Sequence, residues 1–310
     1  MTETESSAEL FGVLSFNKPA GITSRDLVNK VQRLVKPAKV GHAGTLDPMA
    51  TGVLLVCVGP ATRLVSMLQE GAKTYVAEFT LGQTSDTDDS TGTVQQHAVS
   101  DPPPSLEAIV ACLDKMTGVI SQVPPDYSAV HVDGQRAYSL ARQGQELSLR
   151  AKEIEIHAIQ VLRYEWPRLE LEISCGSGTY IRSIARDLGL QLGCGGLMSR
   201  LERIQIGAFS LAEAITVEDL TEENLRQFLC PAVRIVADLP QFDCTQSDLP
   251  NLLCGRRLAM SADRMSTTAS LPVGQVVALT STHFTELLAL AELTEDNLLQ
   301  PRTVFVRVRS

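Results

Sequence analysis

Several features that would assign this chain to other protein classes are missing from its 310 residues. No apolar run reaches the length of a membrane-spanning helix. The opening residues, MTETESSAEL, are acidic and polar, whereas a secretory signal peptide has a basic start and an apolar centre. No repeat of solenoid period occurs either. We therefore expect a cytoplasmic globular protein without a membrane anchor, with residues 1–10 as a flexible tail.

Cysteine chemistry is also poorly represented. The chain has 7 cysteines, an odd number, and none of them forms a C-x-x-C pair. Widely spaced cysteines of this kind indicate neither a zinc site nor a disulfide framework. Cys57, inside the apolar stretch VLLVCVG, is typical of a buried hydrophobic residue. We therefore expect no metal site.

The chain lacks the net positive charge that attracts nucleic acid, because its formal net charge is −9. The distribution is uneven, however, and basic residues outnumber acidic ones between residues 11 and 63. The basic residues there are Lys18, Arg25, Lys30, Arg33, Lys36, Lys39 and Arg63, against Asp26 and Asp47. A local basic face on an acidic protein is compatible with RNA binding, and a solvated helix surface is the alternative.

The most informative segment is GHAGTLDPMATG, from Gly41 to Gly52, which places one carboxylate in a glycine-rich turn before an apolar strand. Glycine permits positive φ and close backbone approach, and Pro48 restricts the backbone of Asp47 to extended or turn conformations. Asp47 is therefore a candidate catalytic residue held in a defined position. The alternative is that its carboxylate closes an Asx-Pro turn, and spacing alone does not separate the two.

Hydrophobic periodicity predicts an α+β fold. Strands are indicated at residues 12–19, 52–59, 73–82, 153–164 and 169–175, and helices at 24–35, 61–69, 105–116, 135–143 and 179–189. Because strands often follow one another without a helical crossover, the sheet should be mixed and largely antiparallel, with flanking helices. Residues 83–104, rich in Ser, Thr, Asp, Gly and Pro, are expected to form a long exposed connection.

Beyond about residue 230 the pattern changes to short β runs such as GQVVALT and ELLALAEL, separated by polar turns. We therefore expect a main domain at residues 11–230 and a small β-rich domain at residues 231–310. Arg302, Arg307 and Arg309 belong to the last of these runs. They either contact RNA phosphates or are ordinary charges of an edge strand.

Four segments taken together resemble the TruB-type family of bacterial tRNA pseudouridine synthases. They are the Asp47 loop, Lys73-Thr74-Tyr75, the turn from Ser177 to Arg182, and PPDYSAVHVDGQRAYSLAR at residues 124–142. The resemblance extends to about residue 225, with a weaker match to the family's PUA-like RNA-binding domain. Related enzymes that modify ribosomal RNA usually have Arg before the Leu-Asp pair, where this chain has Thr45.

The resemblance implies an isomerase, an intramolecular transferase that converts uridine 55 in the T-loop of tRNA to pseudouridine. The N-glycosidic bond breaks and the uracil is rejoined to C1′ through its C5, without a metal or redox cofactor. Because the target nucleotide lies inside a folded loop, base flipping is implied. The expected partner is tRNA, bound by a monomer, and assistance with tRNA folding would use the same cleft. A non-enzymatic RNA-binding protein and a synthase for ribosomal RNA are the alternatives.

The family's catalytic residues correspond to Asp47, Tyr75 and Arg182. Asp47 would attack ribose C1′, remove the 2′ proton or add to uracil C6. Arg182 would pair with Asp47 and keep it ionised, since an adjacent cation lowers the pKa of a carboxyl group. Tyr75 would lie against the detached base, where an aromatic face tolerates rotation of uracil, and its hydroxyl would help to move the C5 proton. A core aromatic in a strand is the alternative for Tyr75.

The family's RNA contacts correspond to His42, Tyr180, Leu201, Lys18 and Arg63. His42 would fill the space that the flipped nucleotide leaves, and an ordinary satisfied histidine is the alternative. Tyr180 and Leu201 would line the uracil pocket, with simple core packing as the alternative for Leu201. Lys18 and Arg63 fit phosphate contacts.

One departure from the family's pattern is His131, which stands where many members have Lys. It puts one phosphate contact in doubt, though not the chemistry.

Overall fold

The computed structural model describes residues 10–97, 102–128, 130–132, 135–145, 148–268, 270–281, 283 and 285–306. The predicted tail therefore lies, apart from Leu10, outside the described residues, as do Arg307 and Arg309. The backbone of His131 is described, but its side chain is not.

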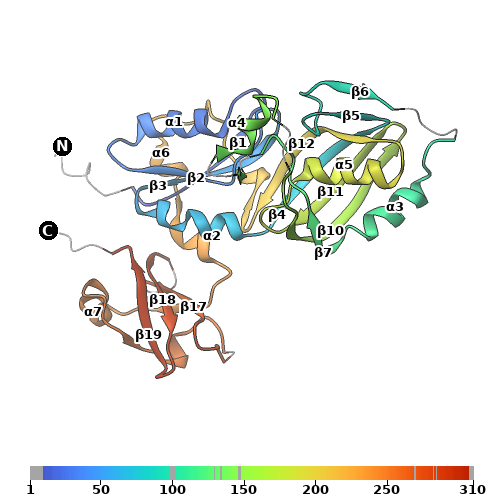
Figure 1. The fold of residues 1–310 in the computed structure, drawn as a ribbon. Coiled ribbons are helices and arrows are strands. Elements are labelled where there is room, and N and C mark those ends of the chain that lie inside the picture. The colour runs from blue at the N-terminus through green and yellow to red at the C-terminus, as the bar shows by residue number, and fades with distance from the viewer. Residues whose placement is uncertain are drawn as a thin grey trace.

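A ten-stranded sheet forms the body of the molecule (Figure 1). Its order is β14 (Cys230–Pro231), β1 (Gly12–Lys18), β3 (Thr51–Val58), β12 (Gly196–Ile206), β4 (Lys73–Leu81), β11 (Arg168–Cys175), β10 (Lys152–Glu165) and β7 (Gly118–Gln122). Two shorter strands join it, β2 (Val40–Ala43) on β3 and β13 (Phe209–Ser210) on β12. Only the β12–β3 pairing within this sheet is parallel among the described strands. The predicted α+β class with a mixed, largely antiparallel sheet is confirmed.

Side-chain caps start two of the helices in the described part of the chain. The helices are α1 (Ser24–Leu34), α2 (Val65–Glu70), α3 (Leu106–Asp114), α4 (Ala137–Ala141), α5 (Ile181–Gln191), α6 (Leu225–Phe228) and α7 (Leu249–Leu253). Thr23 and Asp26 form a capping box that starts α1, and Ser105 caps α3. Helix α1 buries Leu27, Val28 and Val31, as the periodicity predicts. No helix in the described part of the chain is long and apolar enough to span a membrane.

Two parts of the body differ from the sequence expectation. The region expected to be a long exposed connection contains a hairpin, β5 (Gln83–Ser85) and β6 (Val94–Gln96), because side chains of its own turn satisfy the backbone. Asp89, for example, accepts hydrogen bonds from the Thr91 N–H and hydroxyl at 2.9 and 2.6 Å. The helix expected at 61–69 is divided into a 3₁₀ turn, η1 (Gly59–Leu64), and α2. A further two-stranded ribbon, β8 (His131–Val132) and β9 (Gln135–Arg136), precedes α4.

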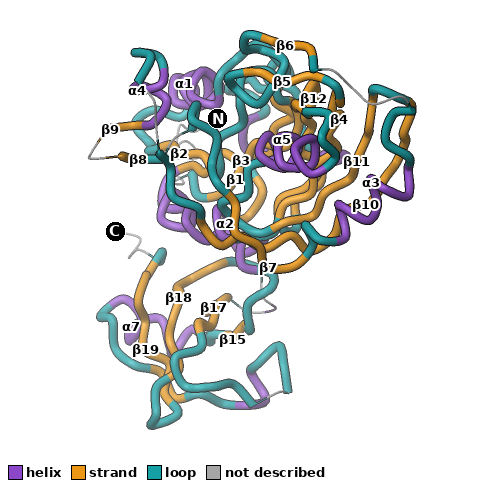
Figure 2. The backbone as a smooth tube through the Cα atoms, turned by 45° about the vertical axis from the view of Figure 1, so that its right-hand side comes forward, coloured by secondary structure: helices purple, strands orange, loops and turns teal. Residues whose placement is uncertain are grey.

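A separate five-stranded sheet follows, as Figures 1 and 2 both show beneath the main body. Its order is β15 (Gln241–Asp243), β17 (Val276–Thr280), β18 (Leu287–Leu293), β19 (Leu298–Val304) and β16 (Leu258–Ala259). Phe305 joins the two parts, because its ring stacks on Phe11 with centroids 5.1 Å apart. Since β14 spans residues 230 and 231 and pairs with β1, the domain boundary proposed there falls within a strand of the large sheet.

Candidate active site

A cavity of about 520 Å³ opens in the main body where β4, β12 and α5 come together. The two strands are neighbours in the sheet and α5 packs against both (Figure 1). The cavity is lined by residues 44–47, 69, 73, 75, 127, 128, 138, 176–182, 201 and 203. Of the predicted site residues, Asp47, Tyr75, Tyr180, Arg182 and Leu201 line the cavity, whereas His42, Lys18 and Arg63 are not part of its lining.

The conformation of the loop that carries Asp47 is fixed by a glycine and by hydrogen bonds to neighbouring residues. Gly44 has a φ of +81°, a conformation that residues with a side chain rarely adopt. The Ser24 hydroxyl donates to the Leu46 carbonyl at 3.2 Å and accepts from the Leu46 N–H at 3.0 Å. The Asp47 carbonyl accepts from the Ala50 N–H at 3.0 Å, so Asp47 does close a turn, but through its backbone. Its carboxylate is therefore left for the cavity.

The carboxylate of Asp47 is paired with Arg182, which lies 135 positions later in the chain. Arg182 Nε lies 3.1 Å from Asp47 Oδ2, and the Arg182 side chain is 8% exposed against 34% for Asp47. On its other side the guanidinium lies 3.5 Å from Asp89 Oδ2 and donates to the carbonyls of Thr87 and Tyr127 at 3.1 and 3.0 Å. The hairpin turn and the Tyr127 segment thus hold Arg182 in the orientation in which it meets Asp47.

The pKa of Asp47 is raised from its ordinary value of 3.8, and burial is the main cause. Arg182 and Lys18 act in the opposite direction, while the neighbouring Asp89 raises the pKa further. The sequence correctly predicts the pairing with Arg182. Arg182 also lowers the pKa of Asp47, as expected, but the net shift is upward because removing the carboxylate from water outweighs the attraction of one cation.

Tyr75, Tyr180 and Leu201 form the apolar part of the cavity. Tyr75 lies on β4, is 8% exposed, and belongs to the same core cluster as Leu201. Tyr75 and Leu201 therefore fit both interpretations, the core residue and the site residue, since each packs in the core and also lines the cavity. Tyr180 precedes α5, where its N–H donates to Gln122 Oε1 at 2.9 Å and its carbonyl accepts from Gln122 Nε2 at 3.1 Å. Burial raises the pKa of both phenols.

His42 lies on β2, just before the Asp47 loop, and is partly buried. Its Nδ1 is buried without a hydrogen-bond partner among the described residues. Burial, followed by Arg25 and Arg203, lowers its pKa, so the ring is neutral at pH 7. The alternative of an ordinary satisfied histidine therefore does not fit the Nδ1 of this ring.

Lys18 is placed differently from the sequence expectation of a phosphate contact. Its side chain is 0% exposed, and its ammonium donates to the carbonyls of Pro19, Ile22 and Pro48 at 2.9, 3.0 and 3.4 Å. Burial lowers its pKa to about 8. A buried ammonium surrounded by carbonyls has no free donor for a phosphate. Its place next to Pro48 makes it a brace for the Asp47 loop.

Arg63 is also engaged away from the cavity. Its guanidinium donates to the Val304 carbonyl at 2.9 Å and lies 4.5 Å from the centre of the Phe305 ring. Both contacts are to the end of the five-stranded sheet. Arg63 therefore joins the two sheets in this structure, which differs from the predicted phosphate contact.

Two residues of the site are missing from the sequence prediction. Asp89 is not among the predicted site residues, but it is 4% exposed and lies 3.5 Å from the Arg182 guanidinium. Arg203, on β12, is 1% exposed and lines the cavity beside Tyr75. Neither residue lies within the four family segments. The one available signal was that Arg203 lies two positions after the predicted Leu201 on the same strand, because alternate residues of a strand share a face.

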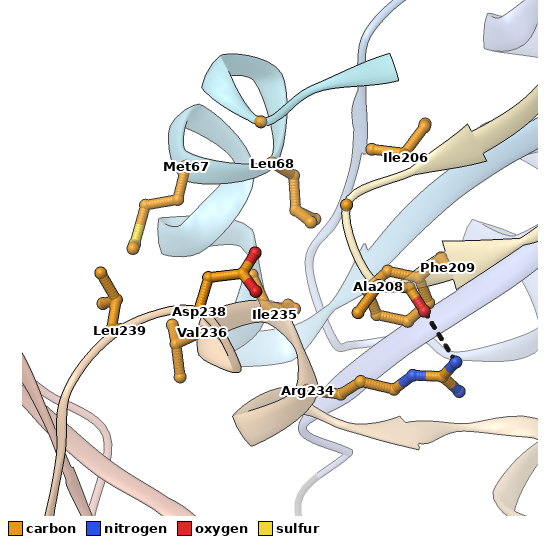
Figure 3. A pocket seen from close by; sticks show the side chains of 12 residues that line it. Met67, Leu68, Ile206, Ala208, Phe209, Arg234, Ile235, Val236, Asp238 and Leu239 are labelled. Carbon is orange, nitrogen blue, oxygen red and sulfur yellow. Dashed lines mark hydrogen bonds between the residues drawn. The ribbon is translucent and has the colours of Figure 1, made fainter. Parts of the chain in front are cut away.

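A second hollow, of about 150 Å³, lies between α2, the β12–β13 turn and the 3₁₀ turn η3 (Ala232–Val236) (Figure 3). Met67, Leu68, Ile206, Val236 and Leu239 make it mainly apolar. Arg234 is already bonded there, to the Ala208 carbonyl at 2.9 Å and to the Phe209 ring at 4.8 Å from its centre. This hollow contains none of the predicted site residues.

Metal ligands do not cluster in the described part of the chain, where no group of three or more His, Cys, Asp and Glu side chains is arranged to hold an ion. Reactions that the site can support from its own residues are those of a positioned carboxylate beside a guanidinium, with an aromatic surface for a planar group. The absence of a cofactor stays an expectation.

Family models match most of the main body. Residues 32–181 match the TruB family pseudouridylate synthase N-terminal domain, and residues 182–237 match the tRNA pseudouridylate synthase B C-terminal domain. Among curated relatives, the tRNA pseudouridine synthase B of Syntrophomonas wolfei is 38% identical over 306 residues, which are 96% of this chain and 99% of the relative. That of Microcystis aeruginosa is 40% identical over 304 residues, covering 95% and 99%.

Solved structures agree with this similarity. A chain of an H/ACA RNP bound to a substrate RNA containing 2′-deoxyuridine superposes with a TM-score of 0.74 at 26% identity, covering 97% of this chain and 86% of that chain. A chain of a Cbf5-Nop10-Gar1 complex gives a TM-score of 0.74 at 27% identity, with coverage of 96% and 85%.

Proposed function

The chain belongs to the TruB family of tRNA pseudouridine synthases, and from this membership we propose that it isomerises uridine 55 in the T-loop of tRNA, with Asp47 as the essential carboxylate. The observation that carries the proposal is the Asp47–Arg182 pair, 3.1 Å apart, at a cavity lined by Tyr75, Tyr180 and Leu201. A volume of about 520 Å³ is sufficient for one extruded nucleotide.

Each group has a role in this proposal. Arg182 orients the Asp47 carboxylate and balances its charge during the reaction. The Tyr75 ring supports the base while it turns, because a flat aromatic surface has no fixed hydrogen bonds to break. His42, neutral and with an unpaired Nδ1, would enter the space left in the stacked loop. The named relatives favour tRNA over ribosomal RNA as the substrate.

The domain assignment remains part of the proposal. Residues 11–230 would carry the chemistry, and residues 231–310 would form a PUA-like domain that adds RNA affinity. Support comes from the separate five-stranded sheet. Two of its arginines are paired, Arg302 with Glu292 at 2.9 Å and Arg257 with Asp296 at 3.8 Å. These pairs favour the alternative of ordinary strand charges for Arg302.

A T stem-loop transcript with tritium at the uracil C5 positions tests the function directly. Wild-type protein should release the tritium of one uridine when the C5–C1′ bond forms, and a transcript with cytidine at that position should release none. Asp47→Asn should bind the RNA and release no tritium. Release by Asp47→Asn would contradict the assigned role, and normal tRNA refolding by this inactive variant would show that folding assistance is separate from the chemistry.

A further inference from the structure

Arg203 is a buried cation at the centre of the site that the reaction scheme above does not use. It lies on β12, opposite Tyr75 of β4 and Gly52 of β3. Gly52 has a φ of +100°, and a Cβ there would lie 2.2 Å from the Arg203 carbonyl oxygen. Only glycine therefore lets β3 approach β12 this closely, and the Arg203 side chain extends beneath the Asp47 loop as a result.

The hydrogen bonds of Arg203 go to neutral groups. Its Nε donates to the Val53 carbonyl at 2.8 Å and its Nη2 to the Gly44 carbonyl at 3.1 Å. Among the described residues, no carboxylate lies within ion-pair distance of it, whereas Arg182 in the same cavity has two. A guanidinium that is 1% exposed and has no counter-ion is costly to bury. A neutral donor could make the same two hydrogen bonds to carbonyls, so these bonds alone do not explain why a charged residue is buried here.

Three further basic groups lie near Arg203, although Asp47 acts on Lys18 and Glu70 acts on Lys73. Burial, with a contribution from Arg203, lowers the pKa of Lys18 and of Lys73 to about 8 and lowers that of His42. Lys73 and Arg203 both line the cavity next to Tyr75. We call this part the cationic side of the cavity. It is distinct from the side where Asp47 and Arg182 neutralise each other.

The Tyr75 phenol connects Arg203 to the cavity. Arg203 and Tyr75 are cross-strand partners and both line the cavity, which places the guanidinium beside the phenol. A guanidinium has only N–H donors, so the phenol oxygen is the acceptor in a contact between the two groups. Its own O–H is then left to donate into the cavity. A donor chain of this kind, starting at a charged group, is stronger than a single neutral hydrogen bond.

We propose that Arg203 is a positioning residue that aims the Tyr75 hydroxyl at the uracil and stabilises the negative charge that the base carries when it detaches. This inference rests on the proposed function. When the C1′–N1 bond breaks, its electron pair goes to N1 and the base becomes an anion. The anion then forms the C5–C1′ bond, the C5 proton is removed, and N1 takes up a proton, so substrate and product are isomers.

The test uses the variants Arg203→Met and Arg203→Lys in the full chain, with Arg200→Met as control. Arg200 is on the same strand but 58% exposed and paired with Glu202 at 3.1 Å. We expect Arg203→Met to bind the stem-loop within about threefold of wild type and to lose about 10²–10³-fold in single-turnover rate. Arg203→Lys should recover at least about tenfold of that loss, and Arg200→Met should match wild type.

A second substrate separates charge stabilisation from a structural role. 5-Fluorouridine at the target position has a better leaving group, because fluorine stabilises the negative charge of the base. If Arg203 stabilises that charge, Arg203→Met should lose less in the rate of 5-fluorouridine consumption than in the rate with uridine. Equal losses on both substrates, or an Arg203→Met rate within tenfold of wild type, would overturn the proposal.

If Arg203→Met does not fold, the same two-substrate comparison on Arg203→Lys decides. Lysine keeps the charge but cannot hold the phenol and both carbonyls with one planar group. An intermediate loss that is smaller with 5-fluorouridine supports the proposal, and an equal loss contradicts it. Wild-type activity on the stem-loop is measured alongside, so failure of the proposed function is recognised separately.

Discussion

Arg182 Nη1 lies 3.5 Å from Asp89 Oδ2 while Nε of the same side chain lies 3.1 Å from Asp47 Oδ2, so one guanidinium is shared by two carboxylates from different loops. Asp89 is the more buried of the two and also accepts from the Thr87 hydroxyl at 2.8 Å. The arrangement fixes the cation from behind and leaves Asp47 as the partner nearest to solvent.

Asp89→Asn should slow the reaction by about 10–100-fold and lower the free energy of unfolding by about 1–3 kcal/mol. The substitution removes the charge that holds Arg182 from behind but leaves the turn able to form. Single-turnover rates and urea unfolding measure the two effects. Asp86→Asn is the matched control, since Asp86 is exposed in the same hairpin and accepts a hydrogen bond from the Thr93 N–H at 2.7 Å. Equal behaviour of the two variants would contradict the role of Asp89.

The acid limb of the activity profile should have its midpoint above 3.8, because burial raises the pKa of Asp47 and the reaction needs the carboxylate ionised. The same shift means that ionised Asp47 destabilises the folded protein. The contribution of this side chain to stability is fully present below the pKa that it has in the unfolded chain, and it is lost as pH rises through its higher pKa in the folded protein.

Asp47→Asn should therefore be at least as stable as wild type at pH 7, with the difference shrinking toward pH 3.8. Rates from pH 4 to 8 and chemical unfolding at several pH values check both statements. A less stable Asp47→Asn at pH 7 would mean that the Arg182 pairing outweighs burial.

Lys18→Met should lower stability by about 1–3 kcal/mol and slow catalysis without weakening RNA binding. The loss arises because three carbonyls, including that of Pro48 beside Asp47, lose their donor. Lys39→Met, at an exposed lysine of the same basic region, is the control. A large rise in the dissociation constant for RNA with Lys18→Met, but not with Lys39→Met, would support the predicted phosphate contact of Lys18 instead.

The lowered pKa of Lys18 also predicts how the free energy of unfolding depends on pH. The unfolded lysine holds its proton more tightly than the folded one, so the contribution of Lys18 to stability should increase as pH rises from about 8 toward 10.5. The difference in unfolding free energy between wild type and Lys18→Met, measured over this range, should widen. A constant difference would show that the ammonium is not desolvated in the folded protein.

Arg63→Ala should loosen the attachment of the five-stranded sheet, at a cost of about 1–2 kcal/mol, through loss of the Val304 hydrogen bond and the contact with Phe305. Limited proteolysis should then cut faster between the two sheets, near residues 237–240. Activity on an isolated stem-loop should not change. Arg33→Ala, at an exposed arginine of α1, serves as control. If proteolysis is unchanged and RNA binding is weaker, Arg63 contacts an RNA phosphate, as the sequence predicts, and does not hold the two sheets together.

Local features of this protein could be predicted from its sequence because they depend on neighbouring residues. The Thr23 cap, the buried face of α1 and the alternation along β4 each follow from interactions within a few positions. The same holds for the Asp47 loop, whose glycines and proline restrict their own backbone. The α+β class and the small C-terminal sheet followed from these local patterns taken in order.

The electrostatics of the site were decided only by the tertiary structure. Lys18, Arg63, Asp89 and Arg203 are ordinary charged residues in the sequence, and their roles depend on partners that lie far away in the chain. Burial determines whether such a charge meets a phosphate, braces a loop or faces a reacting base, and burial is a property of the assembled sheet. The sequence alone therefore determined which residues could carry chemistry, and the packing of β3, β4 and β12 decided which of them line the cavity, because only packing removes them from water.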